Sequence, residues 1–297
     1  MKKQKAKSTR ARMTPIMIVM CVILCFYCVS LVLPFVWALI TSFKTNLDFN
    51  ANKIGLPNKW VWNYGEVFGK YFVPIKTSSG NDVVGLVGMF GNSILYSTLS
   101  SVIATIVPCI TAYLCARFKC KFSTVVVNVV IIAMILPIVG SQPSQIAILK
   151  MLKMYDNIWL LWLMHATPLG GMYFLMFYNF FRAMPPDFVD AAKIDGANNM
   201  QILLRVVLPV VKNMLFTIML IKFIQCWNDY QTPLLLMPNA PTAAYGLYWM
   251  SETTIVGMAT APMRMAASII MFVPMLVVFM LLQKRLLGNL MVGGIKG

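Results

Sequence analysis

The chain has 297 residues, of which 59% are hydrophobic and 11% charged, and its mean hydropathy is +0.75. Soluble domains carry about 25% charged residues, so this composition excludes an ordinary soluble domain and indicates an integral membrane protein. The net charge is +16, but the basic residues form no stripe with interleaved aromatics. We therefore predict no nucleic-acid binding.

Six apolar segments are long enough to cross about 30 Å of hydrocarbon. The first is too long for a signal-peptide core, and no small-residue cleavage site follows it, so it predicts a retained helix. We expect an all-α, polytopic protein with a basic N-terminus (1–13), a six-helix transmembrane domain (14–286) and a Gly-rich tail (287–297). The predicted spans are 14–41, 91–115, 123–141, 157–181, 205–227 and 265–283.

The distribution of Lys and Arg predicts the orientation. Basic residues concentrate before the first span, around Arg117, in the segment 182–209 and after the last span. Because short basic loops stay on the cytoplasmic side, both termini and the segment 182–209 are expected there. Two longer loops, 42–90 and 228–264, are then expected outside.

The sequence offers no chemistry for catalysis or for metal binding. The only histidine is His165, and none of the seven cysteines forms a C-x-x-C pair, so we predict no metal site and no enzyme. The closest approach to a phosphate-binding loop, Gly69-Lys70-Tyr71, lacks both the glycine spacing and the Ser/Thr. We expect His165 to form a hydrogen bond within the bundle.

The stretch 181–212 is unusually polar for an insert between two apolar spans. Pro185 and Pro186 can open a helix, and Gly196 is expected to end it in a left-handed conformation. Asn198, with Gln201 three residues later, predicts a capping box that starts a second helix. A hairpin lying on the membrane surface is the alternative, but it predicts a basic face that is missing here. An acidic and alanine-rich face favours a protein groove.

This stretch resembles a known motif. Asp190-Ala191-Ala192-x-x-x-Gly196, followed by Val206-x-Leu208-Pro209, resembles the EAA motif of ABC-importer permeases, with Asp190 where that family usually has Glu. Asp195-Gly196-Ala197 resembles the D-G-A around its glycine. The segments Trp227-Asn228-Asp229-Tyr230 and 293–297 (GGIKG) are similar to those of sugar-importer permeases of the MalG type.

The resemblance implies a coupling helix between transmembrane helices 4 and 5 that docks on a cytoplasmic ATPase dimer, which binds ATP and Mg; this chain would bind no cofactor. It also implies a second, MalF-like permease, an extracytoplasmic binding protein, a carbohydrate substrate and a bacterial plasma (inner) membrane. The residues that it implies for ATPase coupling are Asp190, Ala191, Ala192, Asp195, Gly196, Ala197, Leu208 and Pro209, with Gly294, Lys296 and Gly297 of the tail.

A second set of residues is a candidate for the solute path or for contact with the binding protein. Ionisable groups near membrane spans are functional candidates, although snorkelling of the lysine, interfacial aromatics and a membrane-resting loop would explain the same residues structurally. The set is Lys222, Gln225, Trp227, Asn228, Asp229, Tyr245, Tyr248 and Trp249.

Two alternative functions remain at this stage. An ABC permease for an amino acid or a peptide would share the EAA motif. An ion-coupled secondary transporter would need acidic residues within its spans, commonly in an inverted repeat, and the predicted spans have no central Asp or Glu.

Overall fold

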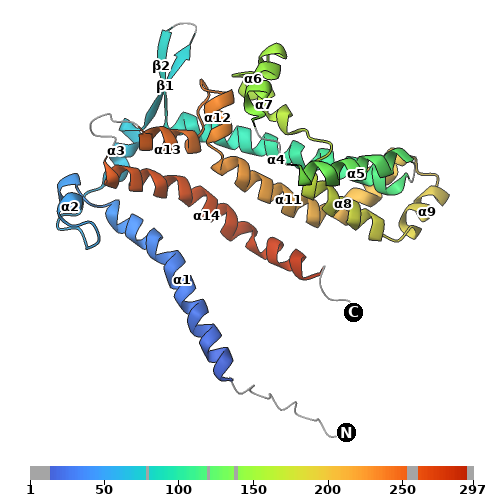
Figure 1. Ribbon diagram of the computed structural model, residues 1–297, viewed down its shortest axis with the longest axis horizontal. Coiled ribbons are helices and arrows are strands. Elements are labelled where there is room, and N and C mark those ends of the chain that lie inside the picture. Colours follow the sequence, from blue (N-terminus) through green and yellow to red (C-terminus); the bar gives the residue numbers. More distant parts are fainter. Residues whose placement is uncertain (1–13, 78–79, 119–120, 137–139, 253–259, 293–297) are drawn as a thin grey trace.

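The computed structural model describes residues 14–77, 80–118, 121–136, 140–252 and 260–292, and most of these residues are helical (Figure 1). Within these ranges, four helices are long and apolar enough to cross a membrane. They are Pro15–Thr41, Leu86–Arg117, Asn199–Asn228 and Ala261–Leu281.

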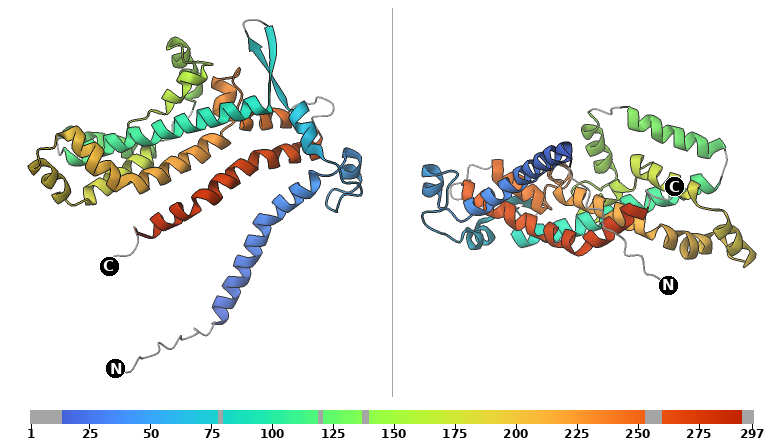
Figure 2. Two further views of the ribbon diagram at one scale, coloured as in Figure 1. Left: turned by 180° about the vertical axis from the view of Figure 1, so that it is seen from behind. Right: turned by 90° about the horizontal axis from the view of Figure 1, so that it is seen from below.

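The centre of the molecule is α4 (Leu86–Arg117), which lies alongside α8 (Gly171–Ala183) and α11 (Leu208–Asn228) (Figures 1 and 2). One face of α4 is buried and carries small polar side chains. Small residues at a helix interface let neighbouring backbones approach closely. The resulting van der Waals contacts hold the helices together, because lipid provides no hydrophobic force between them. The buried small polar residues of α4 are Ser93, Ser97, Ser100, Ser101 and Thr105.

The structure differs from the prediction at the third and fourth spans: the third is a short helix and the fourth is broken. The third corresponds to α5 (Lys121–Ile135), which has 15 residues. The fourth is broken into α7 (Ile158–Leu161), a 3-10 turn (η1, Trp162–His165) and α8. The break occurs because Pro168 supplies no amide hydrogen and Gly171 has a φ of +56°. The hydroxyl of Thr111 on α4 donates a hydrogen bond of 2.7 Å to the Pro168 carbonyl that the break exposes.

The fifth predicted span starts at residue 205, but the helix that contains it starts earlier. This helix begins with α10 (Asn199–Ile202), continues through a π-helical turn (η2, Leu203–Val207) and joins α11. Pro209 stands in the first turn of α11. Because proline has no amide hydrogen, the carbonyl four residues before it cannot form the usual α-helical bond. The wider turn lies immediately before this position, where a π-bulge accommodates the interruption.

The first helix, α1 (Pro15–Thr41), is exposed along most of its length. It contacts α14 (Ala261–Val292), with the rings of Phe35 and Phe272 5.0 Å apart, and then diverges from the bundle (Figure 2). Because α14 continues to Val292, helix replaces the first residues of the predicted tail 287–297. The predicted N-terminal segment 1–13 and the tail residues Gly294, Lys296 and Gly297 lie outside the described residues.

The two predicted outer loops are largely structured. The first, 42–90, holds α2 (Asn46–Ala51), α3 (Asn63–Lys70) and an antiparallel hairpin of β1 (Phe72–Thr77) with β2 (Gly80–Gly85). The second, 228–264, holds α12 (Gln231–Leu236) and α13 (Ala243–Glu252). The hairpin is an exception to the all-α prediction, and it projects from the same end of the molecule as α13 (Figure 1).

Asn239 connects three segments at this end. Its side-chain oxygen accepts a 2.8 Å hydrogen bond from the Lys76 amide of β1. Its backbone amide donates to Asp156, which follows α6 (Gln142–Met151), at 2.9 Å, and its side-chain amide donates to the same carboxylate. The hairpin, the α6–α7 turn and the α12–α13 loop are therefore held together by one side chain.

A glycine at this end allows a close approach of α13 to its neighbours. A Cβ added to Gly246 would collide with the Met89 sulfur and would lie 2.9 Å from the Tyr71 ring. We expect Gly246→Ala to lower the free energy of unfolding by about 1–3 kcal/mol, the usual cost of overpacking. Thermal unfolding of the purified protein in detergent would measure this. Gly91→Ala on α4 is the control, because its added methyl would meet nothing within 4 Å; equal stability of both variants would contradict the packing.

Candidate functional site

The polar stretch folds as a short helix followed by a glycine turn. Helix α9 covers Asp187–Ile194 and begins directly after Pro186, with two carboxylates, Asp187 and Asp190, in its first turn. Negative charge there is stabilised by the exposed amides of the helix N-terminus. Gly196 has a φ of +80°, and the amide of Ala197 donates to the carbonyl of Ala192 at 3.0 Å. The predicted left-handed glycine cap is confirmed.

The second helix begins with the predicted capping box. The Asn198 side chain accepts from the Gln201 amide at 2.8 Å, and the Gln201 side chain accepts from the Asn198 amide at 2.9 Å. Both bonds satisfy amides that have no partner within the helix. The turn between α9 and α10 is therefore closed on both sides by local hydrogen bonds.

The two alanines of the EAA-like motif face different ways. Val189 and Ala192 are buried in the cluster that includes Ile202 of α10 and Val207 of η2, the two elements that α9 contacts. Ala191 is exposed, so the predicted alanine face divides: one alanine attaches α9 to the bundle and the other lies on its free surface. The exposed side chains of α9 are Asp187, Phe188, Asp190, Ala191, Lys193 and Ile194.

Asp190 has a partner within its own chain. Its Oδ1 lies 3.0 Å from Nη2 of Arg117, the last residue of α4. The pair places α9 and the end of α4 at the same end of the bundle. Beside it lies a hollow of about 160 Å³, lined by residues that include Tyr113, Phe181 and Pro186.

The other residues predicted for ATPase coupling also divide between exposed and half-buried positions. Asp195 is exposed at the end of α9, and Ala197 is half-buried after the glycine turn. Leu208 packs against the core formed by α4, α8 and α11, whereas Pro209 is exposed.

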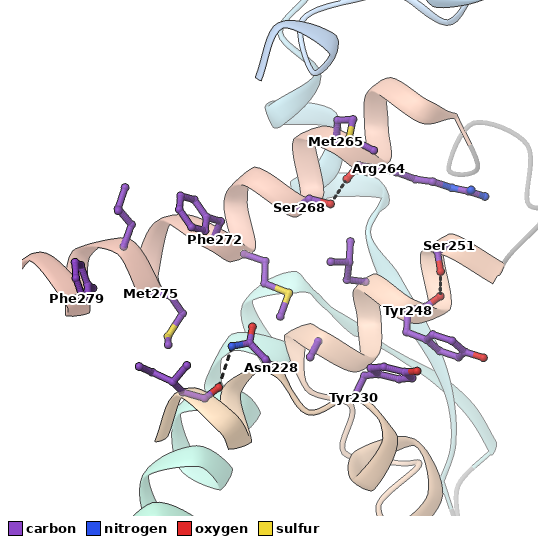
Figure 3. Close-up of a pocket in the computed structure, with 15 residues that line it drawn as sticks. Asn228, Tyr230, Tyr248, Ser251, Arg264, Met265, Ser268, Phe272, Met275 and Phe279 are labelled. Carbon is purple, nitrogen blue, oxygen red and sulfur yellow. Dashed lines mark hydrogen bonds between the residues drawn. The ribbon is translucent and has the colours of Figure 1, made fainter. Parts of the chain in front are cut away.

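At the other end, α11, α13 and α14 line an open cavity of about 1000 Å³ (Figure 3). The rings of Tyr230 and Tyr248 stack beside it with centroids 4.6 Å apart, and Asn228 and Ser251 also line it. The wall formed by α14 is mostly Met and Phe side chains, with Arg264 and Ser268 near the start of that helix. The other polar lining residues are Asn228, Tyr230, Tyr248 and Ser251. Such a cavity can accept a ligand with both apolar faces and hydroxyl groups.

The predicted solute-path residues divide between two faces of α11. Asn228 lines the cavity. Lys222 and Gln225 instead contact Tyr173 of α8: the ammonium lies 4.5 Å from the ring centroid, and the amide donates to the phenol oxygen at 3.2 Å. These residues therefore do not form one continuous surface.

The remaining members of that set have structural contacts. Trp227 is buried between Phe90 and Phe223, and Asp229 accepts a 3.1 Å bond from the Thr232 amide at the start of α12. Trp249 is half-buried at the edge of a core cluster.

Tyr245, predicted together with Tyr248 as a contact residue, is buried in that cluster. Burial, and to a smaller extent the charge of Asp156, raises the pKa of Tyr245. Of the two predicted tyrosines, only Tyr248 lines the cavity.

His165 forms the expected hydrogen bond within the bundle. Its Nε2 lies 2.9 Å from the hydroxyl of Tyr96 on α4, which confirms the prediction. No group of His, Cys, Asp and Glu side chains suited to a metal ion occurs among the described residues.

Three residues of these sites were not singled out from the sequence for their roles. Arg117 was counted only as a topological charge, and its pairing with a residue 73 positions away has no local signal. Tyr230 enters the sequence analysis only as the last residue of the Trp227–Tyr230 segment, and Arg264 lines the cavity from the first turns of α14.

Comparison with known proteins places the chain among transport components. The sequence model of the family described as binding-protein-dependent transport system inner membrane component matches residues 105–290. The chain is 24% identical over 284 residues to the diacetylchitobiose uptake system permease protein of Streptomyces coelicolor, covering 91% of this chain and 86% of that protein. It is 24% identical over 277 residues to the galactooligosaccharides transport system permease protein of Bacillus subtilis, covering 93% and 94%.

A solved structure shares the fold. A chain in the crystal structure of a bacterial ABC transporter involved in the import of the acidic polysaccharide alginate superposes with a TM-score of 0.75 at 22% identity. The match covers 95% of this chain and 99% of that one.

The capping box allows a local test of the α9–α10 turn. We expect Asn198→Ala to weaken the turn by about 1 kcal/mol, because the Gln201 amide loses its acceptor. Hydrogen–deuterium exchange would show roughly five-fold faster exchange at residues 201–202, the factor that corresponds to this energy. Asn199→Ala, one position into the helix, is the control; unchanged exchange in Asn198→Ala would contradict the capping role.

Proposed function

The chain belongs to the family of inner-membrane components of binding-protein-dependent transport systems, and from this we propose that it forms half of the translocation pore of an ATP-driven carbohydrate importer. It hydrolyses no ATP itself; a separate ATPase dimer binds ATP and Mg. The other half of the pore is a second, MalF-like permease, and an extracytoplasmic binding protein delivers the solute.

We propose a six-span topology in a bacterial plasma (inner) membrane, with both termini and α9 on the cytoplasmic side. The basic flanks of the sequence support this orientation. Two sets of contacts are consistent with it: Arg117 meets Asp190 at one end, and Lys76 meets Asn239 at the other. In this topology α5 and the broken segment α7–α8 account for the two shorter crossings.

Coupling to the ATPase is assigned to α9. The observation that supports it is the division of this helix: Val189 and Ala192 fasten it to the bundle, while Phe188, Ala191 and Ile194 remain exposed. Ile194 is 87% exposed and Phe188 is 52% exposed, so both side chains are available for a partner surface to cover. The tail residues Gly294, Lys296 and Gly297 are proposed as a further ATPase contact.

The carbohydrate class is supported by the relatives and by the cavity. The permeases with which the chain aligns over most of its length are named for diacetylchitobiose and for galactooligosaccharides. A Tyr pair with neighbouring Asn and Ser side chains provides aromatic surface for the apolar faces of a sugar and polar groups for its hydroxyls. An amino-acid or peptide importer is the alternative within the same family.

Uptake by cells with and without this chain tests the substrate class. With a panel of labelled di- and oligosaccharides, amino acids and peptides, we expect uptake of a carbohydrate to disappear when the chain is removed. Restoration of uptake by the same chain supplied in trans is the control. Loss of amino-acid or peptide uptake with unchanged carbohydrate uptake would overturn the assignment.

A substitution on the free face of α9 tests the coupling role. Ala191→Asp should abolish co-purification with the ATPase and reduce uptake at least ten-fold, because a charge enters an apolar interface, while the chain still reaches the membrane. Ala192→Asp is unsuitable, because its carboxylate would enter this chain's own core.

Ala51→Asp, the same change at an exposed helical position of α2, is the matched control. Intact ATPase assembly and uptake in Ala191→Asp would exclude α9 as the docking element.

A further inference from the structure

The Asp190–Arg117 pair joins two elements that are distant in sequence and lie beside a hollow. Arg117 ends α4, and Asp190 lies in the first turn of α9. The adjacent hollow of about 160 Å³ is lined by both α4 and the α8–α9 turn, so close packing does not fill the space between them. The ion pair is a direct link across this region.

The remaining attachments of α9 lead to other helices. Val189 and Ala192 pack on the start of the α10–α11 helix, and the Gly196 turn connects α9 to it covalently. A movement of α9 would therefore reach α11 through apolar contacts. It would reach the end of α4 through the charge pair.

The geometry of Asp190 suits an internal partner. Its carboxylate extends from the N-terminal turn, where the side chain of a helical residue leans toward the preceding turn. It reaches Nη2 of Arg117 at 3.0 Å, while the Arg117 side chain is only 27% exposed and has little freedom to turn away. A half-exposed carboxylate that is held by a largely covered guanidinium is already partnered before any second chain approaches.

We propose that Asp190 and Arg117 are a pair of positioning residues that transmit movement of α9 directly to α4, the central helix of the bundle. This inference rests on the proposed docking role of α9 and adds to it. The exposed apolar side chains of α9 bind the ATPase, whereas Asp190 binds its own chain. Breaking the pair should leave assembly intact and reduce the amount of solute moved per ATP hydrolysed.

Charge reversal in the assembled transporter tests this inference. We would reconstitute the parent, Arg117→Asp, Asp190→Arg and the double variant in proteoliposomes with the partner permease, ATPase and binding protein. Each single reversal should lower the ratio of uptake to ATP hydrolysis by about two- to five-fold, the range that corresponds to the free energy of an exposed ion pair. The double variant should return to within about two-fold of the parent, because the pair is rebuilt with opposite polarity.

Lys121→Asp is the matched control, since it makes the same change of charge at the first residue of α5, close in sequence to Arg117. Two results would overturn the inference. Single variants with a parental ratio would show that the pair transmits nothing. A double variant as defective as Asp190→Arg, with Arg117→Asp unaffected, would show that Asp190 faces the ATPase.

A second measurement separates this inference from the docking role. A double-mutant cycle on the thermal unfolding of this chain alone, without the ATPase, should give a two- to five-fold coupling in the unfolding equilibrium between positions 117 and 190. Additive effects would exclude the pair, whatever the docking variants show. Intact assembly of Ala191→Asp together with a coupled cycle would instead remove the docking role and leave the pair standing.

Discussion

The close packing of α4 against α8 and α11 is the constraint on which the rest of the structure depends. Lipid provides no hydrophobic force that would drive helices together, so their association requires backbones near enough for van der Waals contact and for hydrogen bonds between helices. The serines and threonine on the buried face of α4 permit that approach. The same face supplies hydroxyl donors, one of which, Thr111, satisfies the carbonyl where the chain breaks before α8.

Because α4 runs through the whole bundle, it connects two clusters of different composition. One cluster, at the α9 end, contains Phe174, Phe177 and the buried residues of α9 and α10. The other contains Tyr71, Tyr245 and Met89 and fastens the hairpin end to α13 and α14. A displacement of either cluster acts on the same helix. The function proposed above, with an ATPase at the α9 end and a solute at the other end, would use this connection.

The sequence predicts the features that depend on local chemistry. Apolar length identified the long helices, and the glycine cap and the capping box followed from residues four or fewer positions apart. The break between η1 and α8 was missed because a hydropathy window averages over Pro168 and Gly171. Which of Ala191 and Ala192 faces inward depends on the packing of Ile202, and the partner of Asp190 lies 73 residues away. Neither is encoded in a short segment.

At the opposite end, the contacts of Asn239 also join residues that are distant in sequence. Its one side chain serves both the Lys76 amide and the Asp156 carboxylate, and the residue connects three segments that are far apart in sequence. The partner on β1 is a backbone amide, which any residue other than proline supplies, whereas the partner after α6 is a specific carboxylate. Among descendants of this protein, position 76 can therefore vary widely, while a change at position 239 requires a matching change at position 156.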